Sequence, residues 1–213
     1  MEVVGNYVID NLLANGGFAT VFKGHHRTKH SKKVAIKIIK KEKLQSQDDI
    51  INEIKISMKL TEIRHENIIE LFECMHNAHS VYMVMEYCNG GNLANYLNKV
   101  GILSEETIRL FVKQLASALG VLYKLNIIHR DLKLENILLT HANILEIFYP
   151  KPNEITLKIA DFGISKLVGN SLTTFTPCGT LIYMAPETRT TAIYDTKVDL
   201  WSLGIIIHQC LTG

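Results

Sequence analysis

The fold of this chain is decided by one stretch of sequence, Ile127-Ile128-His129-Arg130-Asp131-Leu132-Lys133-Leu134-Glu135-Asn136-Ile137-Leu138-Leu139. Apolar runs on both sides enclose an octet, residues 129–136, with a histidine, an arginine, two acids, a lysine and an asparagine. A loop with so many polar groups between buried segments costs several kcal/mol unless each group has a partner or a chemical role. The stretch therefore predicts a loop whose side chains are held in place for chemistry.

Length and composition are typical of a globular protein. The chain has 213 residues, of which 47% are apolar and 21% charged, so it can bury a core as one domain or as one domain in two lobes. Its 23 Lys and Arg residues against 21 Asp and Glu give a net charge of +2. This balance is poor for a protein that must neutralise many nucleic-acid phosphates, so we expect no nucleic-acid partner.

The cysteines and the apolar runs give no sign of zinc binding, secretion or membrane insertion. The four cysteines lie far apart without a C-x-x-C pair, and the acidic start Met1-Glu2 does not look like a secretion leader. The apolar run 203–207 is far shorter than the roughly 20 residues that a bilayer requires. We expect a cytoplasmic protein with reduced thiols and no membrane anchor of its own.

Hydrophobic patterning changes character near residue 89. Before it, β-branched and aromatic runs predict five short strands, at residues 7–13, 20–25, 33–39, 68–75 and 81–87. One helix is predicted between Asp48 and Leu60, with Ile50, Ile54 and Met58 on a single apolar face.

After residue 89 the pattern becomes mainly helical. Ser104 is a plausible N-cap, and the spacing of Phe111, Leu115, Leu119 and Leu122 predicts a helix that follows it. The sequence thus predicts a β-rich half, a short polar crossing and an α-rich half.

Two features of the β-rich half have more than one interpretation. The segment 14–21 contains Gly16 and Gly17 between two strands, which is typical of an ordinary hairpin turn but also of a loop whose backbone N–H groups approach phosphates. Lys37 ends the run Val34-Ala35-Ile36-Lys37, where a lysine is either an exposed edge residue or a ligand-binding cation. Neither feature decides the question by itself.

Two further motifs follow the decisive stretch, Asp161-Phe162-Gly163 and Ala185-Pro186-Glu187. In chain order the motifs Val-Ala-Ile-Lys, His-Arg-Asp-x-x-x-x-Asn, Asp-Phe-Gly and Ala-Pro-Glu resemble the set that marks protein kinases. The resemblance implies an α+β, bilobal kinase fold with a five-stranded antiparallel N-lobe that carries one helix, and a mainly helical C-lobe.

The resemblance implies ATP and Mg²⁺ as cofactors and a role for each matching residue. Lys37 would contact the α- and β-phosphates and pair with Glu53. Asp161 and Asn136 would hold the metal. Asp131 would orient the substrate hydroxyl and accept its proton, and Lys133 would stabilise the transferring phosphoryl group. The positions that match the ATP-binding site are Leu13, Ala14, Gly16, Gly17, Val21, Ala35, Lys37, Met85, Glu86, Cys88 and Leu138.

Three positions are implied to set specificity and regulation. Lys133, two residues after Asp131, implies transfer to serine and threonine, and Thr180 stands where such kinases place the hydroxyl that bonds this pair. Hydroxyl side chains of the segment between Asp161 and Glu187 usually face solvent; they are Ser165, Ser171, Thr173, Thr174 and Thr176. Thr176 matches the usual activating position, where a phosphate would pair with Arg130.

Several segments are similar to the autophagy-initiating serine/threonine kinases, the ULK family. They are residues 84–93, 103–109 and 64–68, Phe18-Ala19, and a lengthened stretch between Leu139 and Lys158. This likeness implies protein substrates, autophagy-complex subunits that act through regions outside this chain, and recruitment to autophagosome-forming membranes through those partners. It also places the kinase domain over residues 1–213, with an N-lobe at 1–86, a hinge at 87–92 and a C-lobe at 93–213.

The family's last C-lobe helices are missing from the sequence, which implies an incomplete C-lobe. We therefore keep two hypotheses for function: an active serine/threonine kinase, or a kinase-like fragment that binds a nucleotide or a partner with little catalysis. A nucleotide hydrolase of another class is disfavoured, because no G-x-x-x-x-G-K-[ST] motif occurs.

Overall fold

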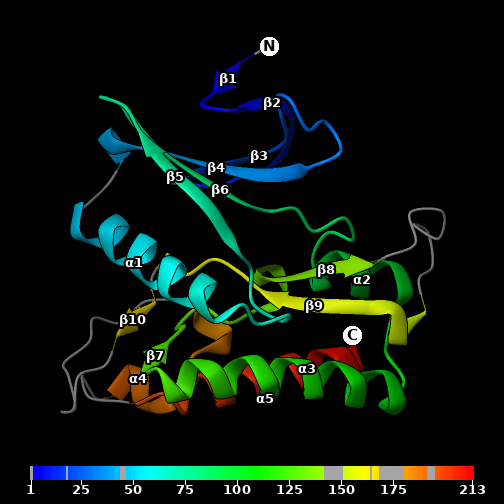
Figure 1. The fold of residues 1–213 in the computed structure, drawn as a ribbon. Coiled ribbons are helices and arrows are strands. Elements are labelled where there is room, and N and C mark those ends of the chain that lie inside the picture. Colours follow the sequence, from blue (N-terminus) through cyan, green and yellow to red (C-terminus); the bar gives the residue numbers. More distant parts are fainter. Residues whose placement is uncertain are drawn as a thin grey trace. The chain divides into compact units, whose positions relative to one another are not determined.

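The chain forms two compact units in a computed structural model (Figure 1). One unit comprises Met1–Arg64 and Ile69–Cys88, and the other comprises His65–Ile68 and Asn89–Gly213. The structure describes residues 2–17, 19–43, 47–141, 151–163, 165–167, 180–190 and 195–213. The change in hydrophobic patterning near residue 89 falls at the last boundary between the units.

The first unit is built on an antiparallel sheet in the order β1-β2-β3-β4-β6-β5. The five predicted strands are present, and the two-residue β1 extends the sheet edge by pairing with β2. The strands are β1 (Val3–Val4), β2 (Tyr7–Asn15), β3 (Ala19–His26), β4 (Lys33–Lys40), β5 (Leu71–His76) and β6 (Ser80–Glu86). The strand predicted from residue 68 begins only at Leu71, because Ile68 belongs to the second unit and bridges to Ile159 there.

Strand alternation gives this sheet two apolar faces. Val34 and Ile36 of β4 lie in one cluster with Val84, whereas Ile39 faces the other side and packs with Ile50 of the helix. Because successive side chains of a strand point to opposite faces, the run from residue 34 to 39 can serve both clusters. A short 3₁₀ turn, η1 (Lys41–Lys43), leads from β4 toward that helix.

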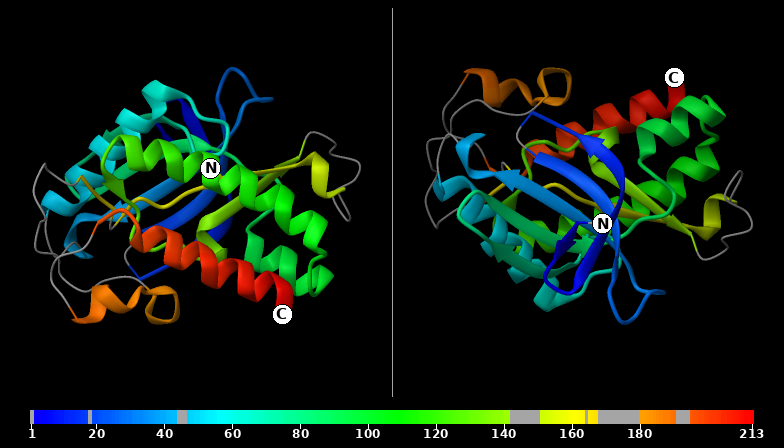
Figure 2. Two further views of the ribbon diagram at one scale, coloured as in Figure 1. Left: turned by 90° about the horizontal axis from the view of Figure 1, so that it is seen from below. Right: turned by 90° about the horizontal axis from the view of Figure 1, so that it is seen from above.

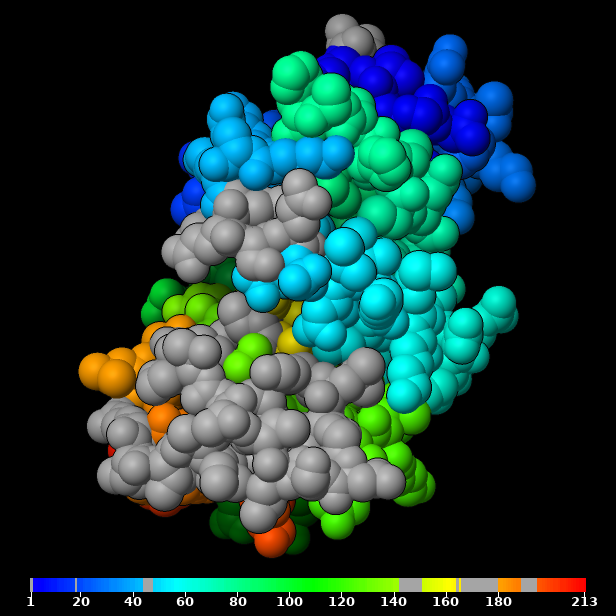
Figure 3. Space-filling view, turned by 90° about the vertical axis from the view of Figure 1, so that its left-hand side faces the viewer, coloured from blue at the N-terminus to red at the C-terminus, as the bar shows by residue number. Residues whose placement is uncertain are grey.

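The predicted helix is α1 (Gln47–Ile63), but its buried face differs from the prediction. Ile50 and Ile54 pack against the sheet, whereas Met58 is 54% exposed, so its assignment to the apolar face was wrong. A helix turns about 100° per residue, so each four-residue step overshoots a full turn by about 40°. Ile56 and Leu60 are buried instead, and Figure 3 shows part of the outer surface of α1 in cyan.

The second unit is mainly helical, as predicted. Its helices are α2 (Leu93–Val100), α3 (Glu105–Lys124), α4 (Pro186–Thr190) and α5 (Val198–Thr212), with 3₁₀ turns η2 (Leu134–Asn136), η4 (Pro152–Glu154) and η5 (Leu181–Tyr183). Ser104 caps α3 as predicted, with its hydroxyl accepting a hydrogen bond from the Thr107 N–H. The predicted apolar positions of α3 are all buried: Phe111, Leu115, Leu119 and Leu122.

Two short antiparallel ladders complete this unit. One pairs β7 (Ile127–Ile128) with β10 (Lys166–Leu167), and the other pairs β8 (Ile137–His141) with β9 (Ile155–Ile159). Helices α3 and α5 lie side by side (Figure 2), joined at one end by a hydrogen bond from the Leu103 N–H to the Cys210 carbonyl. None of the helices in the described ranges combines the length and apolar character that a membrane crossing requires.

Residues 65–68 are fixed in the second unit by a short polar network. The Asn67 amide donates to the Gln114 side chain and to the Leu157 carbonyl, each at 2.9 Å. The Gln114 side chain also donates to the Ile155 carbonyl and accepts from the Leu157 N–H, so it spans one edge of β9. Because Asn67 is 1% exposed, these bonds satisfy polar atoms that have no access to water.

The buried thiol of Cys210 on α5 gives a testable consequence of this packing. Burial raises its pKa to about 11 from an ordinary 9.0, and the thiolate is the form that reacts. Two units of pKa mean about a hundredfold less thiolate, so at pH 8 we expect native Cys210 to react with iodoacetamide on the order of 100-fold more slowly than after unfolding. Stability from this group is lost as the pH rises from 9 to about 11, where only the unfolded state loses its proton.

Site-resolved mass spectrometry with and without denaturant measures this difference. Cys88 is only partly buried and serves as the internal reference for reagent access. Equal alkylation rates of Cys210 in the native and unfolded protein would contradict the buried position of this thiol.

Candidate active site

Asp131 is the centre of a dense set of hydrogen bonds in the second unit. Its Oδ2 accepts from Lys133 Nζ at 2.7 Å and from Asn136 Nδ2 at 3.1 Å. Its Oδ1 accepts from the Thr180 N–H at 3.0 Å and from the Thr180 hydroxyl at 2.9 Å. Lys133 Nζ also donates to the same hydroxyl at 3.0 Å, which closes a triangle of Asp131, Lys133 and Thr180.

This triangle brings together three residues that the sequence predicted to act together. Each of the two carboxylate oxygens of Asp131 accepts two hydrogen bonds, so this side chain is held in one orientation. The Asn136 amide also donates to the Asp131 carbonyl at 2.8 Å, which fixes the backbone of the loop. The arrangement therefore presents an oriented carboxylate beside a fixed ammonium group.

The loop that carries Asp131 is held by hydrogen bonds to Asp199 at the start of α5. Oxygens Oδ2 and Oδ1 of Asp199 accept from the His129 N–H at 2.8 Å and the Arg130 N–H at 3.0 Å. Arg130 adopts φ of 68°, a left-handed conformation that is uncommon outside glycine. Burial raises the pKa of Asp199, while the His129 and Arg130 contacts act in the opposite direction.

The Asp-Phe-Gly segment is packed against the same loop. The His129 ring nitrogen Nε2 bonds the Ala160 carbonyl at 3.0 Å, and its ring meets Phe162 edge to face at 5.0 Å between centroids. Phe162 is 2% exposed, whereas the preceding residue, Asp161, is exposed. Asp161 adopts φ of 65°, so the turn that separates these two side chains is a left-handed one.

A single pair of strands, β8 and β9, positions both Asn136 and Asp161. Asn136 directly precedes β8 and Asp161 closely follows β9, and the pairing of Ile137 with Ile159 brings these ends together. The Ala160 N–H donates to the Asn136 carbonyl at 2.9 Å, which fixes the two segments directly. The ladder thus explains why residues 25 positions apart share one end of the unit.

The chemistry of Asn136 and Asp161 suits a magnesium ion. Both hydrogen bonds of the Asn136 side chain use its nitrogen, so Oδ1 is the atom left for a cation, and Asp161 offers a carboxylate. In the described ranges no group of three or more His, Cys, Asp or Glu residues is arranged to hold a metal. Mg²⁺ is commonly held by one or two protein oxygens together with substrate phosphates, which this pair allows.

In the first unit Lys37 and Glu53 form the predicted pair. Lys37 Nζ lies 2.6 Å from Glu53 Oε1, and both side chains are largely buried, at 12% and 8% exposed. Lys37 lies in the middle of the sheet, where β4 pairs with Val21 of β3 and Met83 of β6. The interpretation of Lys37 as an exposed edge residue is therefore wrong.

The glycine segment of the first unit is a hairpin turn between β2 and β3. Ala14 pairs with Val21 across the ladder, and the Gly16 N–H donates to the Ala19 carbonyl at 2.9 Å. A methyl group added at Gly17 would meet no atom of the described residues within 4 Å. The turn interpretation is confirmed, and the phosphate-binding role of the same backbone stays a prediction.

The other predicted ATP-binding positions of the first unit lie on adjoining strands. Ala35 and Met85 are register partners of β4 and β6, and Glu86 ends β6 just before Cys88. Leu13 on β2 is 46% exposed, as a residue that contacts a ligand would be.

Two predicted positions lie in other parts of the chain. Leu138 is in β8 of the second unit, where it bridges to Asn92. Thr176 lies outside the described residues, so its regulatory role stays a prediction.

Two features of the second unit were not predicted. Asp199 was not singled out from the sequence, although a lone acid at the start of an apolar helix is a signal for a buried hydrogen-bond acceptor. Ser165 was grouped with solvated hydroxyls, but it is 1% exposed and donates to the His129 carbonyl at 3.1 Å. Both residues hydrogen-bond to the backbone of the loop that carries Asp131.

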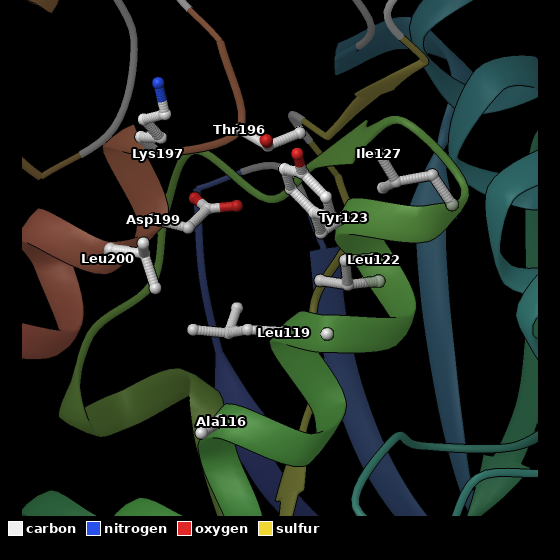
Figure 4. A pocket seen from close by; sticks show the side chains of 10 residues that line it. Ala116, Leu119, Leu122, Tyr123, Ile127, Thr196, Lys197, Asp199 and Leu200 are labelled. Carbon is white, nitrogen blue, oxygen red and sulfur yellow. The ribbon is translucent and has the colours of Figure 1, made fainter.

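An apolar cavity of about 320 Å³ lies between α3 and the start of α5 (Figure 4). It is lined by Ala116, Leu119, Gly120, Leu122, Tyr123, Ile127, Thr196, Lys197, Asp199 and Leu200. None of these residues belongs to the predicted ATP-binding set. The cavity borders Asp199, the residue that accepts hydrogen bonds from the loop of Asp131.

These features define the class of the protein. A family model described as a protein kinase domain matches residues 7–213, and the chain belongs to this family. The predicted α+β kinase fold and the resemblance to protein kinases are thereby confirmed.

Within the family, the chain is similar to a particular group of relatives. Serine/threonine-protein kinase ULK1 of Homo sapiens is 48% identical over 215 residues, which cover 100% of this chain and 20% of that protein. Serine/threonine-protein kinase unc-51 of Caenorhabditis elegans is 42% identical, over 95% of this chain and 24% of the relative. Serine/threonine-protein kinase ATG1c of Arabidopsis thaliana is 40% identical, over 100% of this chain and 27% of the relative. The chain thus spans about a fifth to a quarter of the length of these proteins.

Proposed function

We propose that the chain transfers the γ-phosphoryl group of Mg-ATP to serine and threonine hydroxyls of protein substrates. The observation that carries this proposal is the triangle of Asp131, Lys133 and Thr180, in which a lysine and a threonine hydroxyl both bond the same carboxylate. The triangle brings together a carboxylate that can orient a hydroxyl and an ammonium group that can stabilise a phosphoryl charge. The relatives are named serine/threonine-protein kinases, which supports the same proposal.

In this proposal each residue of the second unit has one task. Asp131 orients the substrate hydroxyl and takes its proton, while the hydroxyl oxygen bonds to the γ-phosphorus and the bond to the β–γ bridging oxygen breaks. Lys133 stabilises the charge on the transferring group. Asn136 and Asp161 hold Mg²⁺, which neutralises charge on the phosphates when it is bound.

The first unit contributes nucleotide binding. Lys37, aligned by its 2.6 Å bond to Glu53, contacts the α- and β-phosphates. The turn at Gly16 and Gly17 offers backbone N–H groups to the phosphates. The adenine ring is proposed to contact the remaining predicted positions: Leu13, Ala14, Val21, Ala35, Met85, Glu86, Cys88 and Leu138.

The organisation of the chain follows from the same assignment. The proposed N-lobe is 1–86, the hinge 87–92 and the C-lobe 93–213. Phosphorylation of Thr176 is proposed to place a phosphate against Arg130, whose backbone is fixed by Asp199. Lys133, together with the Thr180 hydroxyl that it bonds, is proposed to favour serine and threonine over tyrosine.

We further propose a role in autophagy initiation, which the similarity to the ULK1 and ATG1c kinases supports. The partners proposed for this role are protein substrates and autophagy-complex subunits. The proposed location is cytoplasmic, with partners that recruit the kinase to autophagosome-forming membranes.

A second candidate function is a regulatory module that binds a partner with little catalysis. The observation in its favour is the apolar surface of α5, where Leu200 is 56% and Trp201 46% exposed. Such exposure of neighbouring large apolar residues is typical of a contact surface.

The two candidates are separated by incubating the chain with Mg-ATP and a serine-containing protein substrate, followed by mass spectrometry. We expect phosphate on serine or threonine with the unmutated chain and only background with Asp161→Asn, which removes a metal-binding carboxylate. No phosphate from a chain with an intact circular dichroism spectrum would refute the kinase proposal and favour the module.

A further inference from the structure

One turn of the first unit concentrates positive charge that the proposed function does not use. It joins β3 to β4, and residues 27–33 read Arg-Thr-Lys-His-Ser-Lys-Lys. Between Asn11 and Lys41 the chain has eight Lys and Arg residues and no Asp or Glu. Elsewhere it has the other 15 Lys and Arg against all 21 Asp and Glu, a net charge of −6. The small total charge of +2 therefore conceals a strong separation of charge along the chain.

The cations of this turn are exposed and accessible. Arg27, Lys29 and Lys33 are exposed, and no ion pair joins any of them to a residue in the described part of the chain. Lys32 is exposed as well, with its ammonium 4.3 Å from the centroid of the Phe72 ring. Asp10, on the adjoining strand, is engaged by the His25 ring at 2.9 Å. The positive charge is therefore available to an external partner.

The turn is also held in one shape. The His26 ring nitrogen Nδ1 accepts from the Thr28 N–H at 3.3 Å and the Lys29 N–H at 3.4 Å. The Arg27 N–H donates to the Asn6 carbonyl at 2.8 Å. Because these bonds fix the backbone, less conformational entropy is lost when the turn binds a partner.

We propose that the β3–β4 turn is an electrostatic docking surface for membranes rich in anionic phospholipid. In Figure 1 the turn projects beyond the strands that it joins. A projecting tip brings several cations to a flat charged surface at once, without a groove. Clusters of four or more Lys and Arg are characteristic of such contacts.

The residue types favour lipid over a macromolecular partner. Residues 27–33 contain no Phe, Tyr, Trp or aliphatic side chain, the ring of His30 being packed against that of His25, and three of their four formal cations are lysines. Protein interfaces are depleted in lysine and depend on aromatic and arginine anchors, and single-stranded nucleic acids are bound by aromatic stacking. Lysine is a hydrated point charge that suits a diffuse anionic surface. The contact is reversible and inserts nothing into the bilayer.

The test is co-sedimentation of the 213-residue chain with phosphatidylcholine vesicles that contain about a third phosphatidylserine, at about 0.1 M salt. Each cation near such a surface contributes roughly fivefold to binding. The triple variant Arg27→Gln, Lys29→Gln, Lys33→Gln is therefore expected to bind about 100-fold more weakly. Binding should also fall steeply with added salt and should be lost on pure phosphatidylcholine.

A matched control neutralises three exposed lysines of the second unit, Lys99→Gln, Lys113→Gln and Lys124→Gln. It removes the same charge and should retain binding within about threefold. Equal losses in the two triple variants, or no binding of the unmutated chain to anionic vesicles, would overturn the proposal. So would binding to polyglutamate or RNA, but not to vesicles, that is lost in the turn variant. Vesicle binding is read without phosphoryl transfer, so its outcome is independent of the proposed function.

Discussion

Replacing Asp131 with asparagine is expected to lower kcat for phosphoryl transfer by about 10²- to 10⁴-fold. The carboxylate accepts from Lys133, from Asn136 and twice from Thr180, and both of its oxygens are used. An amide places a nitrogen donor against one pair of these donors and cannot take the proton of the substrate hydroxyl. Initial rates at saturating Mg-ATP with a serine peptide measure the change.

The matched control is Asp195→Asn, the same chemical change at a half-exposed aspartate. Its carboxylate lies 3.4 Å from Lys197 Nζ and accepts from the Lys197 N–H at 2.8 Å, a bond that an amide oxygen can keep. Because exposed ion pairs contribute little, kcat should stay within about twofold of the unmutated value. If Asp131→Asn retained a tenth or more of kcat while folding normally, Asp131 would not be the proton acceptor.

Replacing Asp199 with alanine is expected to lower the free energy of unfolding by about 2–6 kcal/mol, since each buried donor left unsatisfied costs about 1–3 kcal/mol. The two donors are the backbone N–H groups of His129 and Arg130. Asp199 itself is 3% exposed, so water does not readily replace its carboxylate. Denaturant titration of the unmutated and variant chains gives the difference.

Two further substitutions calibrate this result. Asp199→Asn keeps one accepting oxygen and should lose about half as much stability as Asp199→Ala. Glu62→Ala removes an exposed acid from α1 and should change stability by less than about 0.5 kcal/mol. An Asp199→Ala loss as small as that of Glu62→Ala would show that Asp199 does not support the loop.

Much of the fold is predictable because its signals are local. The β-branched run in residues 33–39 and the N-cap Ser104 predict a strand and a helix start from a few neighbouring positions. Met58 was assigned to the wrong face because steps of four residues drift around a helix. The start of β5 was placed too early because Ile68 has the composition of a strand residue but pairs singly with Ile159 of the other unit.

The site shows the same division between local and distant information. The triangle of Asp131, Lys133 and Thr180 followed from the resemblance to protein kinases, which implies that these three residues bond one another. The supports of that triangle did not follow, since they depend on long-range packing. Asp199 lies 69 positions from Arg130, and nothing in its own neighbourhood shows that it accepts from that backbone. The burial of Ser165 is likewise a property of the assembled unit.

The position of residues 65–68 has a mechanical consequence. The polypeptide passes between the units three times, after Arg64, after Ile68 and after Cys88. A protease that cuts only between Cys88 and Asn89 would leave no covalent link between fragments 1–88 and 89–213. Asn67 of the first fragment would still be hydrogen-bonded to Gln114 and Leu157 of the second. The two fragments would then travel together through a sizing column until denaturant released them. Because residues 65–68 pack in the second unit while both of their neighbours belong to the first, a cut at Cys88 alone is not expected to separate the two units.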